Sequence, residues 1–188
     1  MKILCYGDSN TFGHNPSKNE NHKNPWPSLI LNHEVINHGV NGRTLTFQPT
    51  ETRFPSAVKT IAEELNDKYD LIIIMLGTND LKFRYHVTDL DFKSAYTFII
   101  KTIKEKYPKQ DILLLPMANI KMNTGEWENA IEKRMAFNCI VRNIALEFNL
   151  SYFDYGNLEL SEDNIHLTQN GHHQLADKIN QYLITNKS

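Results

Sequence analysis

Short apolar runs recur along the chain, and several of them end abruptly at a glycine or a proline. The first, Lys2–Tyr6, is rich in strand formers and stops at Gly7, while Leu71–Leu76 is apolar at every position. A run without alternation is typical of a strand buried on both faces, as in the centre of a parallel sheet. Five strands are expected in total, over residues 2–6, 34–38, 71–76, 112–115 and 152–155.

Helical spacing of apolar residues fills the segments between these strands. A helix that Pro55 opens has its apolar positions at Ala57, Val58, Ile61, Ala62 and Leu65. Further helices are expected near residues 26–31, 92–103, 126–148 and 175–183. Strands that alternate with helices build βαβ units. The pattern therefore predicts one doubly wound α/β domain over residues 1–188, with a five-stranded parallel sheet between two layers of helices.

Three details of this pattern are specific enough to test. The helix at 126–148 has inward-facing candidates at Ile131, Met135, Ile144 and Phe148. Residues 11–25 read as a polar loop, with 15–24 as a surface segment. The two cysteines, Cys5 in a strand and Cys139 in a helix, are expected to be buried free thiols.

Composition and charge narrow the class of protein. The chain has 188 residues, 40% of them hydrophobic and 22% charged, with a formal net charge of −2. This balance gives no basic surface for nucleic acid or for a membrane. Two cysteines without a CxxC pair predict neither a disulfide framework nor a zinc site. No apolar run has signal-peptide or membrane-helix character, so a cytoplasmic protein is expected.

Polar residues useful in acyl transfer follow three of the predicted strands. Ser9 comes directly after the first strand, and the carboxyl ends of parallel strands are where reacting groups collect. After the last strand comes Asp163-Asn164-Ile165-His166. An aspartate can hold the imidazole in the tautomer whose other nitrogen takes a proton from a serine hydroxyl. Taken singly, the serine fits an ordinary turn, and Asp163 fits a polar loop before a helix that Thr168 caps.

A tetrahedral intermediate also needs donors for its oxyanion. The candidates are the backbone N–H groups of Ser9 and Gly42 and the side-chain amide of Asn79, each in a turn after its own strand. For the remaining histidines the sequence predicts only a general environment. His14, His22 and His33 lie in polar segments and are expected to be solvated, His38 is a candidate for a pocket wall, and His172 and His173 are expected to face solvent or a wall.

The four blocks together resemble the SGNH hydrolase superfamily, also called GDSL-type esterases. They read Gly7-Asp8-Ser9-Asn10, Gly39-Val40-Asn41-Gly42-Arg43-Thr44, Gly77-Thr78-Asn79-Asp80 and Asp163-Asn164-Ile165-His166. The extended first block, the Trp26-Pro27 pair and the third block resemble the bacterial arylesterase/acyltransferase branch. The match runs from Ile3 to about Ile179.

The resemblance implies a flavodoxin-like α/β/α sandwich that needs no metal or organic cofactor. It implies Ser9 as nucleophile, His166 as base and Asp163 as the partner of His166. Ser9, Gly42 and Asn79 would form the oxyanion hole, and Asp8 and Asp80 would brace the turns. Asn10 stands where the family has leucine, a change expected to leave the mechanism intact.

The function expected is hydrolysis of small-molecule esters with short acyl chains on small or aryl alcohols. Deacetylation of carbohydrates and acyl transfer use the same chemistry and remain alternatives. A flavodoxin-like binding module lacks the phosphate-binding motifs, and a metallohydrolase using His166, His172 and His173 lacks a recognised ligand set. Segments 44–71 and 116–127 look short beside some relatives, which leaves specificity and a homo-oligomeric state open.

Overall fold

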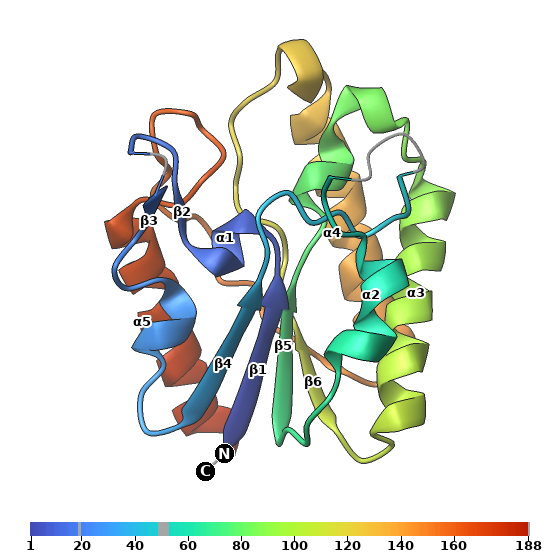
Figure 1. Cartoon of the computed structure of the whole chain (residues 1–188), viewed down its shortest axis with the longest axis vertical. Helices are drawn as coiled ribbons and strands as arrows, with labels where there is room; N and C mark the ends of the chain where they lie inside the picture. Colours follow the sequence, from blue (N-terminus) through green and yellow to red (C-terminus); the bar gives the residue numbers. More distant parts are fainter. Residues whose placement is uncertain (19, 49–52, 188) are drawn as a thin grey trace.

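The five predicted strands pair in parallel to form one sheet (Figure 1). The computed structural model describes residues 1–18, 20–48 and 53–187. Within them the sheet consists of β1 (Lys2–Gly7), β4 (Glu34–Gly39), β5 (Leu71–Met75), β6 (Asp111–Leu114) and β7 (Ser151–Tyr152). β5 is buried at every residue and lies in the middle of the sheet, as its continuous apolar run predicts. β7 begins one residue earlier than the predicted 152–155 and is shorter, because only Ser151 and Tyr152 pair with β6.

The order of the strands across the sheet is β4-β1-β5-β6-β7. Since the chain first places β4 on one side of β1 and then β5 on the other, the order reverses at β1. This is the flavodoxin-like arrangement, in which ligands bind beyond the carboxyl ends of the strands at the reversal. The turns after β1, β4 and β5 therefore meet at one end of the sheet.

Helices cover both faces of the sheet and complete the predicted three-layer α/β/α sandwich (Figure 1). One face carries η1 (Trp26–Leu29) and α5 (Gln169–Lys187), and the other carries α2 (Ala57–Glu64), α3 (Asp89–Lys106) and α4 (Ala130–Glu147). Alternate residues of β1 point to the two sides, so that Leu4 and Tyr6 join one core while Ile3 and Cys5 join the other.

The polar segment at 11–25 has more structure than a loop. After the short α1 (Ser9–Phe12), β2 (His14–Asn15) and β3 (Glu20–Asn21) pair as an antiparallel hairpin. The prediction of a loop is thus wrong for the described residues, whereas the surface position predicted for 15–24 is correct, since most of its described residues are exposed. Residue 19 lies outside the described residues. Three further single turns of 3₁₀-helix are η2 (Thr78–Leu81), η3 (Phe83–Tyr85) and η4 (Gly125–Trp127).

The inward face of α4 differs from the predicted one. The helix begins only at Ala130, because Asn129 adopts a left-handed conformation with a φ of 60° and separates it from η4. Ile144 is buried as predicted, but Met135 is 63% exposed and the core position is Phe137, which is fully buried. Cys139 is exposed, so the prediction of a buried thiol is correct for Cys5 only.

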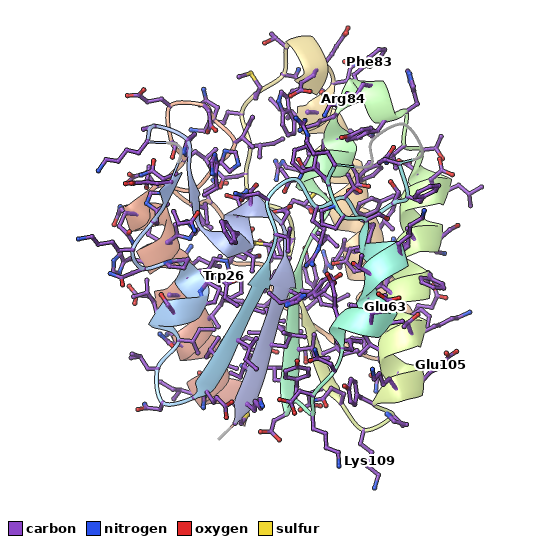
Figure 2. All side chains as sticks on the ribbon, in the orientation of Figure 1. Trp26, Glu63, Phe83, Arg84, Glu105 and Lys109 are labelled. Atoms are coloured by element: carbon purple, nitrogen blue, oxygen red, sulfur yellow. The ribbon has the colours of Figure 1, made fainter. Side chains whose placement is uncertain are left out.

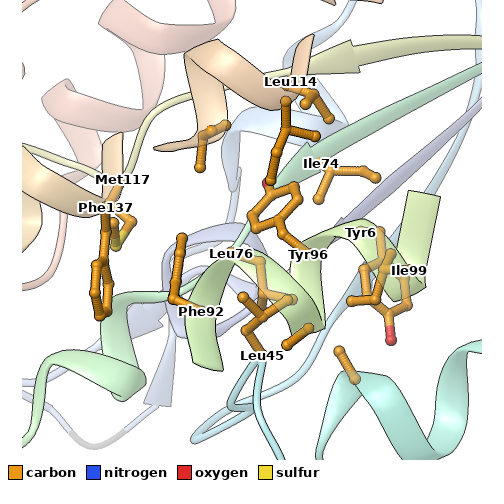
Figure 3. Close-up of a cluster of buried hydrophobic side chains, with 14 of the residues drawn as sticks. Tyr6, Leu45, Ile74, Leu76, Phe92, Tyr96, Ile99, Leu114, Met117 and Phe137 are labelled. Carbon is orange, nitrogen blue, oxygen red and sulfur yellow. The ribbon is translucent and has the colours of Figure 1, made fainter. Parts of the chain in front are cut away.

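Phe137 joins α4 to α3 through an aromatic stack. Its ring lies 3.9 Å from the ring of Phe92 with an angle of 17° between the planes, and Figure 3 shows the pair side by side in the cluster. Both side chains are fully buried. Stacked aromatic pairs add to the stabilisation from burial itself.

A fully buried arginine holds the turn after β4. The guanidinium of Arg43 donates to the carbonyl oxygens of Gly7 and His38, at 3.2 and 2.7 Å, and to Glu64 Oε1 at 2.7 Å. It also lies 4.2 Å from the centre of the Tyr6 ring, and the Tyr6 hydroxyl donates to Glu64. The arginine thereby ties β1, the turn after β4 and α2 together, and Glu64 neutralises its charge.

The ionisation of Glu64 follows from these partners. Burial opposes the charged form of this carboxyl, but His38, Arg43 and Tyr6 outweigh burial and lower its pKa from 4.5 to about 2. His38 stacks on Tyr6 and pairs with Glu64 at 3.5 Å, so the structure places it in this cluster instead of in a pocket wall.

The Phe137 stack can be tested by truncation. Phe137→Ala is expected to lower the free energy of unfolding by about 3–5 kcal/mol, because it removes a buried ring and leaves a cavity. Met135→Ala, on the exposed side of the same helix, should change it by less than about 0.5 kcal/mol. Urea denaturation of both variants measures the difference. Equal losses in the two variants would contradict this assignment of the helix face.

The Glu64 cluster predicts a specific pH dependence. Since the folded-state pKa is depressed, the stabilisation is fully present above about pH 4.5 and is lost as the pH falls toward 2. At pH 7, Glu64→Gln should cost about 2 kcal/mol, below the roughly 3–5 kcal/mol of a fully buried pair because the carboxyl is partly exposed.

The free energy of unfolding, measured between pH 2 and 7, should therefore converge for wild type and Glu64→Gln at the acidic end. Glu63→Gln is the matched control, because Glu63 is the exposed neighbour on α2 (Figure 2). A Glu64→Gln curve parallel to that of wild type over the whole range would argue against the cluster.

Candidate active site

Ser9 is held at the carboxyl end of β1 by a capped helical turn. The side chain of Asp8 caps α1 by accepting a hydrogen bond from the Asn10 N–H at 2.9 Å. Asp8 is 1% exposed, and this burial raises the pKa of its carboxyl. The cap leaves Ser9 as the first residue of α1, with its hydroxyl directed to the loop before α5.

A chain of hydrogen bonds runs from Ser9 through His166 to Asp163. Ser9 Oγ lies 2.9 Å from His166 Nε2, and His166 Nδ1 lies 2.5 Å from Asp163 Oδ2. The other oxygen of Asp163 accepts the backbone N–H groups of Ile165 and His166, both at 3.0 Å. The carboxylate therefore fixes both the ring and the backbone of the histidine.

The charge on Asp163 sets the tautomer of the ring. Burial opposes ionisation of this carboxyl, but the hydrogen bonds from His166 and Ile165 outweigh it and lower its pKa. An ionised Asp163 only accepts hydrogen bonds, so the proton of the neutral ring sits on Nδ1. The lone pair of Nε2 is then directed at the Ser9 hydroxyl, as a general base requires.

The turn after β4 brings Gly42 to the same end of the sheet. Gly42 has a φ of +74°, and a Cβ at this position would lie 2.4 Å from the ring of Phe54. Only glycine fits this backbone without strain or displacement of Phe54. This close packing is a reason for glycine at position 42 besides the backbone N–H that is predicted to donate to an oxyanion.

The turn after β5 braces the turn after β4. Asp80, fully buried, accepts hydrogen bonds from Leu45 N–H at 2.7 Å and from the backbone and hydroxyl of Thr46 at 2.9 and 2.6 Å. Burial raises the pKa of this carboxyl to about 6, against the effect of these donors. Asn79 donates one amide hydrogen to the Arg43 carbonyl at 3.0 Å, which leaves its second hydrogen for another acceptor.

One cavity of about 360 Å³ collects these groups. Ser9, Gly42, Asn79 and His166 all line it. The structure thus brings together the serine, the histidine and the residues expected to donate to an oxyanion, while Asp163, Asp8 and Asp80 lie behind them. The roles of these residues in catalysis stay predictions.

The walls of the cavity include residues that sequence reasoning did not select. Phe54 and Trp127 come from segments 44–71 and 116–127, and Lys82 comes from the end of η2. The nitrogen of Lys82 lies 5.3 Å from the Trp127 ring. Residues 49–52 of the first segment lie outside the described residues. No local motif marks these positions, because only the folded chain carries them to Ser9.

The hairpin supplies a further wall through His14. This ring meets the ring of His166 edge-on, with 4.9 Å between the ring centres and an angle of 70°. Burial lowers the pKa of His14, and the neighbouring His166 lowers it further. His22 is also half-buried and lies 3.2 Å from the Leu167 carbonyl. The prediction that His14 and His22 are simply solvated is therefore wrong.

His172 is the other histidine whose position differs from the prediction. It is fully buried on α5, where its Nδ1 accepts a hydrogen bond from the Trp26 N–H at 3.3 Å. Burial lowers its pKa to about 3, so the ring is neutral in the folded protein. Trp26, the first residue of η1, is itself fully buried (Figure 2). His173 is exposed, as expected.

Among the described residues, no group of three or more His, Cys, Asp or Glu side chains is arranged to hold a metal ion. In the same part of the chain, no helix is both long and apolar enough to cross a bilayer.

Solved structures with the same fold are numerous. A carbohydrate acetylesterase family member from Sinorhizobium meliloti superposes with a TM-score of 0.86 at 21% identity, covering 98% of this chain and 97% of that one. The M. smegmatis aryl esterase gives a TM-score of 0.84 at 24% identity, with 98% of each chain covered. A putative arylesterase from Agrobacterium tumefaciens gives 0.83 at 22% identity, with the same coverage.

At these identities the structural matches establish the fold, and a search of curated protein sequences gives no match. Membership of a family rests on the sequence pattern. The model of the GDSL-like lipase/acylhydrolase family matches residues 5–174, which include all four sequence blocks. The predicted relationship to SGNH hydrolases is thereby confirmed: the chain belongs to the GDSL-like lipase/acylhydrolase family.

Proposed function

We propose that the protein is a serine esterase that cleaves carboxylic esters through an acyl-enzyme on Ser9. The observation that carries this proposal is the unbroken chain of hydrogen bonds from Ser9 Oγ through His166 to Asp163, beside a cavity large enough for a small ester. A serine hydroxyl is a weak nucleophile until a base at hydrogen-bond distance takes its proton. Membership of a family of lipases and acylhydrolases points to the same reaction class.

In the first half-reaction, Ser9 Oγ attacks the ester carbonyl carbon while its proton passes to His166 Nε2. The intermediate is tetrahedral and carries a negative oxygen. It collapses by breaking the bond to the alcohol oxygen, which takes the proton from His166 and leaves. Asp163 stays ionised throughout and stabilises the protonated imidazole. The acyl group remains on Ser9.

Three donors are proposed for the negative oxygen. They are the backbone N–H groups of Ser9 and Gly42 and the second amide hydrogen of Asn79, all on the wall of one cavity. Their fixed orientation is what makes such donors effective, because no dipole has to reorganise during the reaction. The hydrogen bonds of Asp80 to the turn after β4 and of Asn79 to Arg43 support this rigidity.

The second half-reaction uses the same groups in reverse roles. A water molecule gives a proton to His166 as its oxygen attacks the acyl carbon. The second tetrahedral intermediate then expels Ser9 Oγ, which recovers the proton from His166, and the free acid leaves. An alcohol in place of water would give acyl transfer by the same steps.

Short acyl chains on small or aryl alcohols are the substrates we propose. The cavity, at about 360 Å³, is near the lower end of the roughly 300–1,000 Å³ typical of ligand pockets. Phe54 and Trp127 in its walls suit a planar ring. The similarity in fold to the M. smegmatis aryl esterase agrees with this choice.

Deacetylation of a carbohydrate is the second candidate. His14, Asn41 and Lys82 also line the cavity and offer the polar contacts that sugar hydroxyls need. The S. meliloti structure, described as a carbohydrate acetylesterase family member, has the same fold. A panel of esters that differ in acyl length and in alcohol, run on the purified protein, ranks the two candidates and acyl transfer.

Replacing the nucleophile is the direct test. Ser9→Ala should lose nearly all turnover with an unchanged fold, because the hydroxyl is the attacking group. A fluorophosphonate should label wild type at Ser9 with one probe per chain, as read by peptide mapping. Ser56→Ala is the matched control, since Ser56 is buried to a similar extent, 7% against 6% for Ser9. Turnover by Ser9→Ala within tenfold of wild type would refute the proposal.

The oxyanion role of Asn79 has a separate signature. Asn79→Ala should lower kcat by roughly 10²–10³, the effect of removing one oxyanion donor elsewhere. KM should change little, since this donor acts mainly in the transition state. Steady-state kinetics on one aryl acetate measure both constants. An unchanged kcat would remove Asn79 from the oxyanion hole and leave the nucleophile assignment intact.

A further inference from the structure

Asn10 occupies a position that its family's leucine could not fill in the same way. It follows Ser9 in α1 and is 2% exposed. Its side-chain amide donates to the Ile165 carbonyl at 3.2 Å and accepts from the Leu167 N–H at 3.0 Å. Both partners lie in the loop before α5, more than 150 residues away along the chain.

The two partners of Asn10 flank His166. One amide therefore holds the backbone immediately before and immediately after the histidine. It reaches them from the residue next to Ser9, so the serine and the histidine are joined twice, once through their side chains and once through Asn10. Two hydrogen bonds from one rigid amide fix both the distance and the orientation of the histidine loop relative to α1, whereas a single contact fixes only the distance.

Other contacts of this loop do not replace the amide. The Ser161 N–H donates to the His166 carbonyl and Asp163 binds the backbone of the same loop, so these bonds shape the loop internally. The Lys121 N–H and His22 tie the loop to other segments, through the carbonyls of Asn164 and Leu167. Neither Lys121 nor His22 belongs to the element that carries Ser9.

We propose that Asn10 is a positioning residue that sets the distance and angle between Ser9 Oγ and His166 Nε2. It acts through the backbone of the histidine loop and does not line the substrate cavity. The sequence alone suggested that exchanging leucine for asparagine leaves the mechanism intact. The geometry assigns the asparagine a part in it, and this inference rests on the proposed serine esterase function.

The test compares two substitutions at Asn10 with a remote control. Asn10→Leu installs the family's residue and removes both hydrogen bonds, while Asn10→Asp keeps the acceptor oxygen and removes only the donor. Asn180→Leu is the matched control. Asn180, farther along α5, makes the same paired contacts, to the Leu29 carbonyl and the Leu31 N–H.

The readouts are kcat, KM and the rate of fluorophosphonate labelling, each per titrated Ser9, so that unfolded molecules do not count. Asn10→Leu should lower kcat and the labelling rate by about 10- to 100-fold, since a displacement of about 1 Å at a reacting group costs up to about 10² in rate. KM should stay within about twofold, because no side chain that lines the cavity is substituted. The kcat and labelling rate of Asn10→Asp should lie between those of wild type and Asn10→Leu. Asn180→Leu should keep the kcat of wild type.

A kcat for Asn10→Leu within twofold of wild type would overturn the inference, as would an equal loss in Asn180→Leu. If Asn10→Leu is recovered unfolded, Asn10→Asp alone tests the inference, and a kcat within twofold of wild type would then overturn it. Ser9→Ala, assayed alongside, separates this inference from the proposed function. An inactive Ser9→Ala with a fully active Asn10→Leu refutes only the positioning role, whereas an active Ser9→Ala refutes the esterase mechanism itself.

Discussion

The position of β1 between β4 and β5 is the constraint on which the rest of the structure depends. Because these strands are parallel neighbours, the turns that follow them end at the same edge of the sheet. Ser9, Gly42 and Asn79 each come from one of these turns, and all three line one cavity. His166 comes instead from the loop before α5, which places its ring beside Ser9 at the end of β1.

This convergence requires polar groups to be buried where three turns meet. Arg43, Asp80, Asp8 and Asn10 are each no more than 2% exposed. Burial of such groups is costly unless they are hydrogen-bonded. Asp8 accepts a hydrogen bond within its own turn, whereas Arg43, Asp80 and Asn10 each bond to a turn or loop other than their own. Arg43 reaches back to β1 and Asp80 to the turn after β4. The polar network thus makes the relative positions of the turns specific, which apolar packing alone does less well.

Local pattern was sufficient for the strands and insufficient for some helix faces. Leu71–Met75 is recognisable because every residue is apolar, and no partner needs to be known. On α4, by contrast, Met135 and Phe137 are both apolar, and they lie on different faces of the helix. Phe137 shares its face with Val141 and Ile144, which are also buried, whereas Met135 lies on the opposite face from Ile144. Cys139 is four residues after Met135 and shares that exposed face.

The residues of the candidate site likewise fall into those that local motifs predict and those that they do not. Ser9, Gly42, Asn79, Asp163 and His166 follow strands in short motifs, so their meeting at one edge could be expected from the topology. The burial of His172 could not, because it depends on Trp26, a residue 146 positions away. The same holds for Asn10, whose partners are visible only when the first and last turns are side by side. Long-range hydrogen bonds of single polar side chains leave no periodic signal in the sequence.

In the proposed mechanism, chemistry and selectivity are carried by different parts of the molecule. The residues proposed to react sit on turns that the sheet and its buried charges hold rigid. The cavity walls come from segments outside the sheet: His14 from the hairpin, Phe54 from the connection to α2 and Trp127 from η4. A rigid set of donors can serve many esters, because it contacts only the ester group common to all of them. Selection among esters then depends on the walls, and these can change without disturbing β1, β4 and β5. The same fold occurs in structures described as an aryl esterase and as a carbohydrate acetylesterase family member.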